Sequence, residues 1–294
     1  MFRLLQPFEY HEAASVQEAV ALLARYGDRA RVVAGGTDLV ISMKKRELAP
    51  DHVIALSGIP GLDRMEFDSA TGLRLGPLVT HATIARSPIV RQYWPMLATA
   101  SNEVGTPAIR TMGTIGGNVC KSGPSQDTPP VLVALEAELQ LIGPHGERVV
   151  PMEGFCIGPF CTILAPDELI TQIRVPLLPE GGAGCYKWVT KVTATDETLA
   201  GVAAVLVLDG DGVCQDVRIG MGSVAPKAMR ARDAEAVLRG QPVSAALIEE
   251  VARKASGECL PRSRADYRRH MVRVLTRDAL FELWRQLGGP EGAA

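Results

Sequence analysis

Two Gly-Gly turns, Gly35-Gly36 and Gly116-Gly117, constrain the fold of this chain more than any other sequence feature. The first lies in the segment Val33–Leu39, between an expected strand and a following turn. Paired glycines let the backbone approach an anion closely, and a run of unpaired N–H groups there forms a concave phosphate-binding "nest". The segment matches neither the Walker A loop nor the dinucleotide fingerprint G-x-G-x-x-G, so a plain tight turn remains an alternative.

The second turn lies in Thr111–Asn118, where a hydroxyl and an amide side chain flank the glycines. Both side chains can bind phosphate or ribose oxygens. Asp127 follows nine residues after Asn118 and could cap the next helix or accept a hydrogen bond from a ribose hydroxyl. Two nests and one carboxylate suit a long diphosphate cofactor better than a single phosphate.

The patterning around these turns predicts an α+β protein. Ser15 and Glu18 form a capping box at the start of a helix, and strands are expected at residues 31–34 and 52–56, which gives a small β-α-β-like unit. A long Gly- and Pro-punctuated loop is expected over Gly105–Pro130, because little periodicity is visible there.

The second half of the chain shows a different pattern. Pro176–Gly184 is the best linker candidate, and three strands of a meander follow it, the last two joined by the turn Asp209–Gly212. Helices are expected at about 228–239, 245–255 and 267–287. The predicted domains are therefore residues 1–177, with subdomains at about 1–57 and 58–177, and an antiparallel-sheet-plus-helices domain at 178–294.

Composition excludes several classes of protein. The chain is 47% hydrophobic and 22% charged, which excludes a disordered tail and a coiled coil. A net charge of −2 without a basic stripe argues against a nucleic-acid partner, and no apolar run is long enough for a membrane span. The start has no cleavable apolar region, and the six cysteines have no zinc spacing, so we predict free thiols and a cytoplasmic location. The five histidines are scattered and are interpreted as structural.

The two glycine motifs and the Asp127-Thr128-Pro129-Pro130 segment, in this order, resemble the FAD-binding medium subunit of molybdenum hydroxylases, the family of xanthine dehydrogenase and carbon monoxide dehydrogenase. The resemblance covers almost the whole chain. It implies a two-part FAD-binding domain, a C-terminal α+β domain and non-covalent FAD. The residues that it implies at the cofactor are Val33, Ala34, Gly35, Gly36, Thr37, Asp38, Leu39, Gly105, Thr106, Thr114, Ile115, Gly116, Gly117, Asn118, Cys120, Asp127, Ile170 and Lys187.

Two of these positions carry open alternatives. The segment Trp188–Glu197 lacks the family's usual Arg pair and Asp pair and is about three residues longer, so Lys191 could take the role given to Lys187. The family places the position of Cys120 against the flavin ring. In the related 4-hydroxybenzoyl-CoA reductase flavin subunit, a cysteine hereabouts ligates a [4Fe–4S] cluster, but this chain lacks the inserted loop that supplies the partners. We therefore expect a free thiol and no metal.

The resemblance further implies an electron-transfer role within a larger enzyme, and no catalytic acid, base or nucleophile on this chain. A large molybdopterin subunit and a small subunit with two [2Fe–2S] clusters would assemble with it, as a dimer of heterotrimers. Electrons would pass through FAD to an external acceptor, while the substrate stays undetermined. The alternatives are a stand-alone FAD-dependent oxidase or dehydrogenase, and an assembly subunit without flavin.

Overall fold

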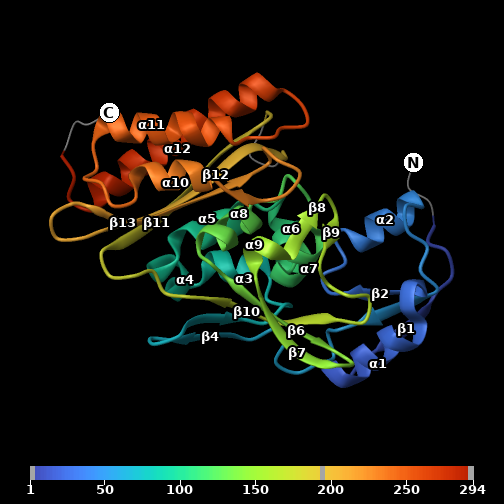
Figure 1. Cartoon of the computed structure of the whole chain (residues 1–294). Coiled ribbons are helices and arrows are strands. Elements are labelled where there is room, and N and C mark those ends of the chain that lie inside the picture. The colour runs from blue at the N-terminus through green and yellow to red at the C-terminus, as the bar shows by residue number, and fades with distance from the viewer. Residues whose placement is uncertain (1–3, 193–195, 291–294) are drawn as a thin grey trace.

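The computed structural model describes residues 4–192 and 196–290, which form three main β-sheets accompanied by helices (Figure 1). Two of the segments discussed above are only partly described. Residues 1–3 at the start of the sequence lie outside the described residues, as do residues 193–195 of the segment Trp188–Glu197. One parallel and two antiparallel sheets combined with helices confirm the predicted α+β class. No helix in the described part of the chain is long and apolar enough to cross a membrane.

The first sheet is the predicted β-α-β-like unit with one additional strand. It is parallel, in the order β1-β3-β2, and consists of β1 (Glu9–Glu12), β2 (Ala30–Val33) and β3 (His52–Ala55). The connections are α1 (Val16–Tyr26), the 3-10 turn η1 (Gly27–Arg29) and α2 (Leu39–Lys45). Strand β1 was not expected, because its sequence EYHE shows no alternation of apolar and polar residues.

The capping box of α1 is present, with one difference from the prediction. Ser15 Oγ accepts the N–H of Glu18 at 3.1 Å, as expected. The carboxylate of Glu18, however, accepts the backbone N–H of Ala14 at 2.8 Å and not that of Ser15. The apolar face of α1 packs in a buried cluster with β3 and with Leu169, and this cluster joins the first unit to the second sheet.

The second sheet is antiparallel in the order β4-β5-β10-β6-β7. Its strands are β4 (Met65–Asp68), β5 (Gly72–Leu75), β6 (Glu138–Gly143), β7 (Gly146–Pro151) and β10 (Leu169–Val175), and a small hairpin of β8 (Cys156–Gly158) and β9 (Cys161–Thr162) lies apart from it. Strands β4 and β7 were not expected. Both are edge strands, β4 has only four residues, and β7 is exposed along most of its length, so neither shows a clear period-2 pattern.

The prediction of a long loop over residues 105–130 is wrong, because short helices occupy most of it. The helices of this unit are α3 (His81–Arg86), α4 (Pro88–Tyr93), α5 (Pro95–Glu103), α6 (Pro107–Met112), α7 (Ile115–Lys121), α8 (Thr128–Ala134) and α9 (Met152–Phe155). Helices α6 and α7 have six and seven residues, too few for a visible 3.6-residue period. Side-chain caps from Thr106 and Thr114 start them.

The third sheet is antiparallel, in the order β11-β12-β13-β14, and helices cover both of its faces (Figure 1). Its strands are β11 (Gly182–Thr190), β12 (Thr198–Leu208), β13 (Cys214–Gly222) and β14 (Met229–Arg230), followed by α10 (Arg232–Leu238), α11 (Ala245–Gly257) and α12 (Ala265–Gln286). The helix expected at 228–239 is shorter than predicted, since β14 occupies its first residues. Residues 176–181 of the expected linker are irregular, and β11 begins inside it.

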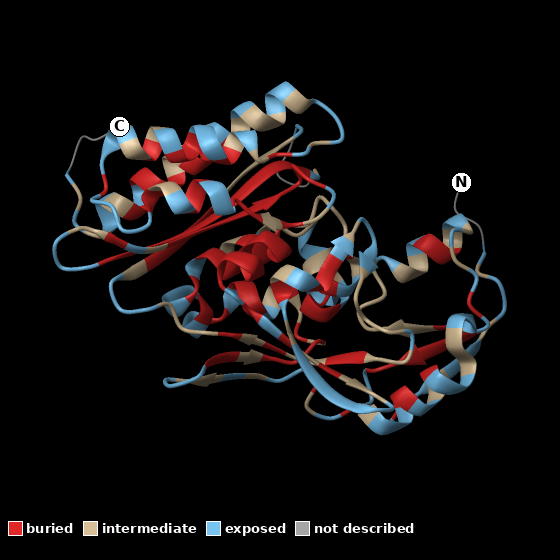
Figure 2. Ribbon diagram, viewed as in Figure 1, coloured by how far each residue is buried: buried red, intermediate tan, exposed pale blue. Residues whose placement is uncertain are grey.

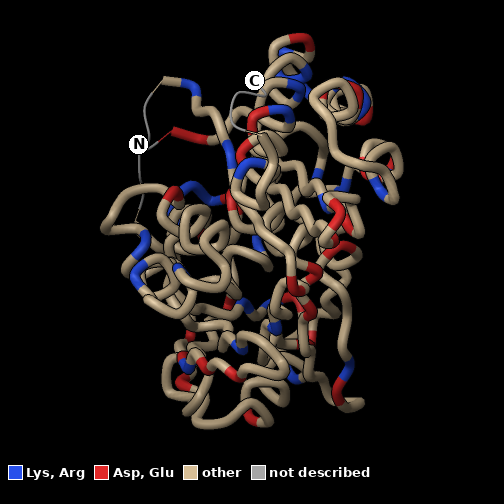
Figure 3. The backbone as a smooth tube through the Cα atoms, turned by 90° about the vertical axis from the view of Figure 1, so that its left-hand side faces the viewer, with Lys and Arg blue, Asp and Glu red and all other residues tan. Residues whose placement is uncertain are grey.

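The second sheet with helices α3–α9 forms the second unit, and the third sheet with helices α10–α12 forms the third unit. The core continues from the second unit into the third. Every residue of β12 is buried, because α12 packs on one face of the sheet and α8 on the other (Figure 2). Ala203, Val205 and Val207 share a buried cluster with Leu97 and Val131 of the central helices. Figure 3 shows Lys and Arg interspersed with Asp and Glu along the backbone.

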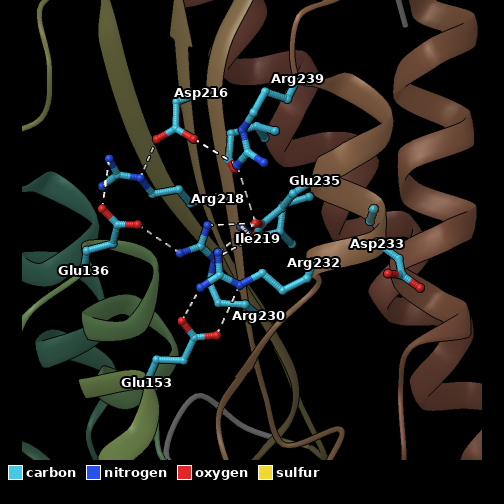
Figure 4. Close-up of polar contacts among 12 residues, drawn as sticks. Glu136, Glu153, Asp216, Arg218, Ile219, Arg230, Arg232, Asp233, Glu235 and Arg239 are labelled. Carbon is cyan, nitrogen blue, oxygen red and sulfur yellow. Dashed lines mark hydrogen bonds and ion pairs between the residues drawn. The ribbon is translucent and has the colours of Figure 1, made fainter. Parts of the chain in front are cut away.

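A buried ion pair lies where the third sheet meets α10 (Figure 4). Arg230 donates to the two carboxylate oxygens of Glu235 at 2.5 and 2.8 Å, and the side chains are 1% and 0% exposed. Glu235 also accepts the backbone N–H of Ile219 at 2.8 Å. Because a buried carboxylate is tolerated only when it is paired and hydrogen-bonded, these contacts fix α10 on the sheet.

Further ion pairs extend from this centre to the second unit (Figure 4). Glu136, which follows α8, lies 3.4 Å from the Arg230 guanidinium and 3.2 Å from that of Arg218. Arg232 pairs with Glu153 of α9. The network therefore crosses between the second and third units in addition to their shared apolar core.

Candidate functional site

A cavity of about 370 Å³ lies where the first parallel sheet meets helices α3 and α7 and strand β10. Most of its accessible lining is apolar, with Leu78, Val104 and Leu164 among the contributors. Twelve residues that the family resemblance implies at the cofactor line it: Ala34, Gly35, Gly36, Thr37, Asp38, Leu39, Thr114, Gly116, Gly117, Asn118, Cys120 and Ile170. The fold therefore brings the two glycine motifs together at one cavity.

The first glycine motif presents a run of unpaired backbone N–H groups. Strand β2 ends at Val33, and α2 begins at Leu39. Between them, no described residue accepts a hydrogen bond from the N–H groups of residues 35–39. Gly36 has φ +71°, a left-handed conformation that favours glycine. Such a run beside a cavity provides the donors that a phosphate group requires.

Gly35 has a different role, which is to let the two motifs touch. A Cβ atom on Gly35 would lie 1.9 Å from the carbonyl oxygen of Met112 in the second motif. Gly113 is less constrained, since a Cβ there would lie 3.1 Å from the carbonyl oxygen of Ile109. Gly35 is therefore required by close packing of the first motif on the second.

The interpretation of the second motif as another nest is wrong, because its N–H groups are used within the protein. Ile115 and Gly116 donate to the carbonyls of Val79 and Pro77 at 2.9 and 3.0 Å. Gly117 donates to Thr114 Oγ1, and the next N–H donates to the Thr114 carbonyl. A Cβ on Gly116 would lie 2.5 Å from Pro77 Cβ, so this glycine permits α7 to pack closely.

Hydrogen bonds and an ion pair with neighbouring residues hold two residues of α7, Asn118 and Lys121. Asn118 Oδ1 accepts the hydroxyl of Thr128 at 2.7 Å, and its backbone carbonyl accepts Gln126 Nε2 at 2.7 Å. Lys121 lies 3.5 Å from the carboxylate of Asp38 and so links the two motifs across the cavity mouth. Sequence reasoning did not identify Lys121, which no recognisable spacing pairs with Asp38.

His81 is a cavity residue that the sequence did not reveal. It is 1% exposed, and its Nδ1 atom is buried without a hydrogen-bond partner among the described residues. Burial, together with the nearby Arg110 charge, lowers the pKa of His81 to about 4, so the ring is neutral at physiological pH. His81 therefore borders the cavity as a neutral imidazole whose Nδ1 is enclosed by the protein.

Cys120 opens into the cavity, and the surrounding protein raises the pKa of its thiol by desolvation. Ser122 Oγ donates to the carbonyls of Gly158 and Cys161, which brings the β8–β9 hairpin close to α7. Even so, the described residues do not place Cys120, Cys156 and Cys161 close enough to share a metal ion.

The remaining predicted residues do not line this cavity. Asp127 is buried, and its Oδ1 accepts the hydroxyls of Tyr186 and Thr198 at 2.8 and 2.7 Å, so it connects α8 to the third sheet. Burial raises the pKa of Asp127. Asp127 occupies the N-cap position of α8 without a side-chain capping bond. Lys187 pairs with Glu282 of α12.

The other four lie beside the cavity lining. Val33 borders a smaller pocket behind the first motif, and Ile115 is fully buried in the core. Gly105, with φ +51°, and Thr106, the N-cap of α6, directly follow the lining residue Val104. Lys191, the alternative to Lys187, is exposed.

Comparison with known families identifies the class of protein. Residues 6–178 match the model described as the FAD binding domain in molybdopterin dehydrogenase. Residues 185–283 match the model described as the CO dehydrogenase flavoprotein C-terminal domain. The fold and cavity thus define an FAD-binding subunit of an oxidoreductase. The chain belongs to the FAD-binding medium subunits of the molybdenum hydroxylases.

Individual relatives agree with this placement. The chain is 35% identical to the carbon monoxide dehydrogenase medium chain of Hydrogenophaga pseudoflava over 281 residues, which cover 94% of this chain and 97% of the relative. It is 35% identical to the nicotine 6-hydroxylase medium subunit of Paenarthrobacter nicotinovorans over 284 residues, covering 95% and 98%. The solved Hydrogenophaga pseudoflava carbon monoxide dehydrogenase superposes with a TM-score of 0.92, over 97% of this chain and 99% of that one.

The residues present fit FAD. The unpaired N–H groups of residues 35–39 supply donors for a diphosphate, and the apolar lining suits a flat aromatic ring. One motif therefore offers unpaired hydrogen-bond donors, while the other shapes the cavity through close packing.

Proposed function

We propose that this chain holds FAD in the cavity between its two glycine motifs and passes electrons from iron–sulfur clusters of a partner subunit to an external acceptor. The observation that carries the proposal is the run of five unpaired N–H groups at residues 35–39 beside a largely apolar cavity. When bound, FAD supplies the capacity to exchange electrons singly with clusters and in pairs with an acceptor.

The chain's own residues bind and orient the cofactor. The N–H groups of residues 35–39 would hold the diphosphate, and Asn118 and Thr114 would contact the chain between diphosphate and ring. Cys120 and Ile170 would lie near the ring, and His81 would support the cavity wall as a neutral imidazole. Of the predicted residues that do not line the cavity, Val33, Gly105, Thr106 and Ile115 would support the cavity wall.

Contact of Asp127 and Lys187 with FAD, which the family resemblance implies, stays a prediction. Both side chains already bond to residues of the third unit, Tyr186 and Thr198 in one case and Glu282 in the other. An indirect role, which fixes the third unit against the cofactor-binding units, agrees best with these contacts.

The partners are proposed from the relatives, which are medium chains of multisubunit enzymes. We propose a large molybdopterin subunit and a small subunit with two [2Fe–2S] clusters, assembled with this chain as a dimer of heterotrimers. We also propose a cytoplasmic location, where a reducing environment would keep the six free thiols reduced. The substrate site would then lie on the large subunit.

Native purification through a tag on this chain tests the proposed electron route. We expect two further chains to co-purify, with molybdenum and iron in the complex and no iron on the isolated medium subunit. Anaerobic addition of carbon monoxide, nicotine, glyceraldehyde or xanthine, chosen from the relatives' names, should bleach the flavin in the complex only. A chain that purifies alone, and whose flavin a substrate reduces without partners, would instead support a stand-alone flavoenzyme.

A further inference from the structure

We propose that Glu9, His11 and His52 form a binding site for a divalent transition-metal ion of the zinc type, separate from the FAD cavity. Their ligand atoms converge: His11 Nε2 lies 3.1 Å from His52 Nδ1, and Glu9 Oε2 lies 3.8 Å from the first and 3.3 Å from the second. In the described part of the chain, no other set of three or more His, Cys, Asp or Glu side chains has this arrangement.

The strand register brings these side chains together. Glu9 and His11 are two residues apart on β1, so both project from the same face of the sheet. His52, the first residue of β3, is paired directly with Glu9 in the parallel ladder. The topology therefore places two imidazoles and one carboxylate on one face, although 41 residues separate the two histidines in sequence.

The spacing agrees with a shared ion. Ligand atoms that each lie ~2.0–2.1 Å from a tetrahedral zinc ion are about 3.3 Å from one another. The three observed separations of 3.1, 3.3 and 3.8 Å lie around that value. Two imidazole nitrogens with one carboxylate oxygen favour zinc and its transition-metal neighbours over Mg²⁺ or Ca²⁺, which prefer oxygen ligands throughout.

A hydrogen bond between the two histidines does not satisfy all three groups. If His11 donates to His52 Nδ1, the one lone pair of that nitrogen is used, and it has no N–H for the Glu9 carboxylate 3.3 Å away. If His52 Nδ1 carries the proton instead, one N–H must serve both the carboxylate and the other ring. A single cation at the centre would accept lone pairs from all three groups at once.

The surroundings hold the ligands and leave the site open to solvent. The Tyr26 ring stacks on His52 with centroids 3.6 Å apart and thereby fixes that imidazole. The side chain of His52 is 10% exposed, whereas that of Glu9 is 70% exposed, so an ion can enter from the carboxylate side and keep water in its remaining position.

The site lies at the end of the first sheet that is remote from the cofactor cavity. His52 is paired with Ala30 at the start of β2, while the nest follows Val33 at the other end of that strand. An ion here would tie the edge strand β1 to β3. We therefore expect it to stabilise the first unit without changing the flavin environment.

Zinc titration of the chelator-treated full chain by calorimetry tests the proposal. We expect one zinc per chain, at least tenfold weaker binding in Glu9→Gln, and binding at least a hundredfold weaker in His11→Ala. His145→Ala, which alters an exposed histidine in the turn between β6 and β7, is the matched control and should bind zinc as wild type does. FAD content should be the same in all four proteins.

Two results would overturn the proposal. One is wild-type zinc binding no tighter than that of His11→Ala, and the other is equal binding in wild type and Glu9→Gln. Glu9→Gln keeps the test decisive if His11→Ala fails to fold, because the Glu9 side chain is largely exposed. Cobalt(II) offers an independent readout, since a tetrahedral site with two nitrogen ligands gives visible absorption bands that must disappear in the same variants.

Discussion

Gly36→Val should lower the affinity for FAD by about 10–100-fold, which is ~1.4–2.8 kcal/mol of binding free energy. Gly36 has φ +71°, and a β-branched residue is a clear outlier in that conformation. Relaxation of the backbone would disperse the five N–H groups at residues 35–39, while the added side chain would lie against the methyl groups of Val33 and Val40. The measurement is FAD released per chain after denaturation, identified by chromatography.

Gly212→Val is the matched control for this experiment. Gly212 has φ +77° in the turn between β12 and β13, and no heavy atom lies within 4 Å of its would-be Cβ. It imposes the same left-handed penalty, of about 1–2 kcal/mol, at a position outside the cavity. Gly212→Val should retain wild-type FAD content, and full occupancy in Gly36→Val would show that the diphosphate lies elsewhere.

Glu235→Gln should lower the free energy of unfolding by about 3–5 kcal/mol, because it removes the buried carboxylate that pairs with the Arg230 guanidinium and leaves it only the half-exposed Glu136. It also weakens the acceptor for the Ile219 N–H, which lies 2.8 Å from Glu235 Oε1. We expect the thermal midpoint to fall by roughly 5–15 °C, measured by circular dichroism.

Glu250→Gln provides the comparison for that variant. Glu250 forms an i,i+3 pair with Arg253 on α11, and the two side chains are 51% and 65% exposed. Exposed pairs of this kind contribute at most about 1 kcal/mol, so its thermal midpoint should stay close to that of wild type. Equal midpoints for the two variants would show that the Arg230–Glu235 pair does not hold α10 on the third sheet.

The elements that the sequence predicted well are long or have strong turn chemistry. Helices α11 and α12 have 13 and 22 residues, and Ser244 caps α11 as hydroxyl residues often do. The hairpin at Asp209–Gly212 has its expected turn, in which Asp209 Oδ1 accepts the N–H groups of Asp211 and Val213. In such segments the local sequence pattern is enough to predict the element.

The short helices α6 and α7 could not be predicted, because tertiary contacts stabilise them. The first residues of α7 donate their N–H groups to Val79 and Pro77, which are distant in sequence and have no recognisable pairing signal. For the same reason the second glycine motif suggested a nest although its amides are already satisfied. The requirement for Gly35 comes from Met112, a contact that only the folded chain reveals.

Sequence patterns predicted the part of the candidate site that one continuous motif contains, and did not reveal the residues that are distinguished by their environment. Residues 34–39 form a continuous segment, so the phosphate-binding interpretation could be made locally. His81 is distinguished by its burial and by the lack of a partner for Nδ1 among the described residues, and neither property is visible in the sequence. The pair between Lys121 and Asp38 likewise depends on how α7 faces α2.

Alkylation of Cys120 tests most directly whether the cavity is the FAD site. Cys120 opens into the cavity, whereas Cys161 is exposed outside it. Because desolvation raises the pKa of the Cys120 thiol, and the thiolate is the reactive form, labelling is best followed at about pH 9. Site-resolved mass spectrometry of the FAD-free chain should show both residues labelled. After reconstitution with FAD, Cys120 should be protected and Cys161 should react as before, whereas equal labelling of Cys120 with and without bound FAD would contradict the assignment of this cavity.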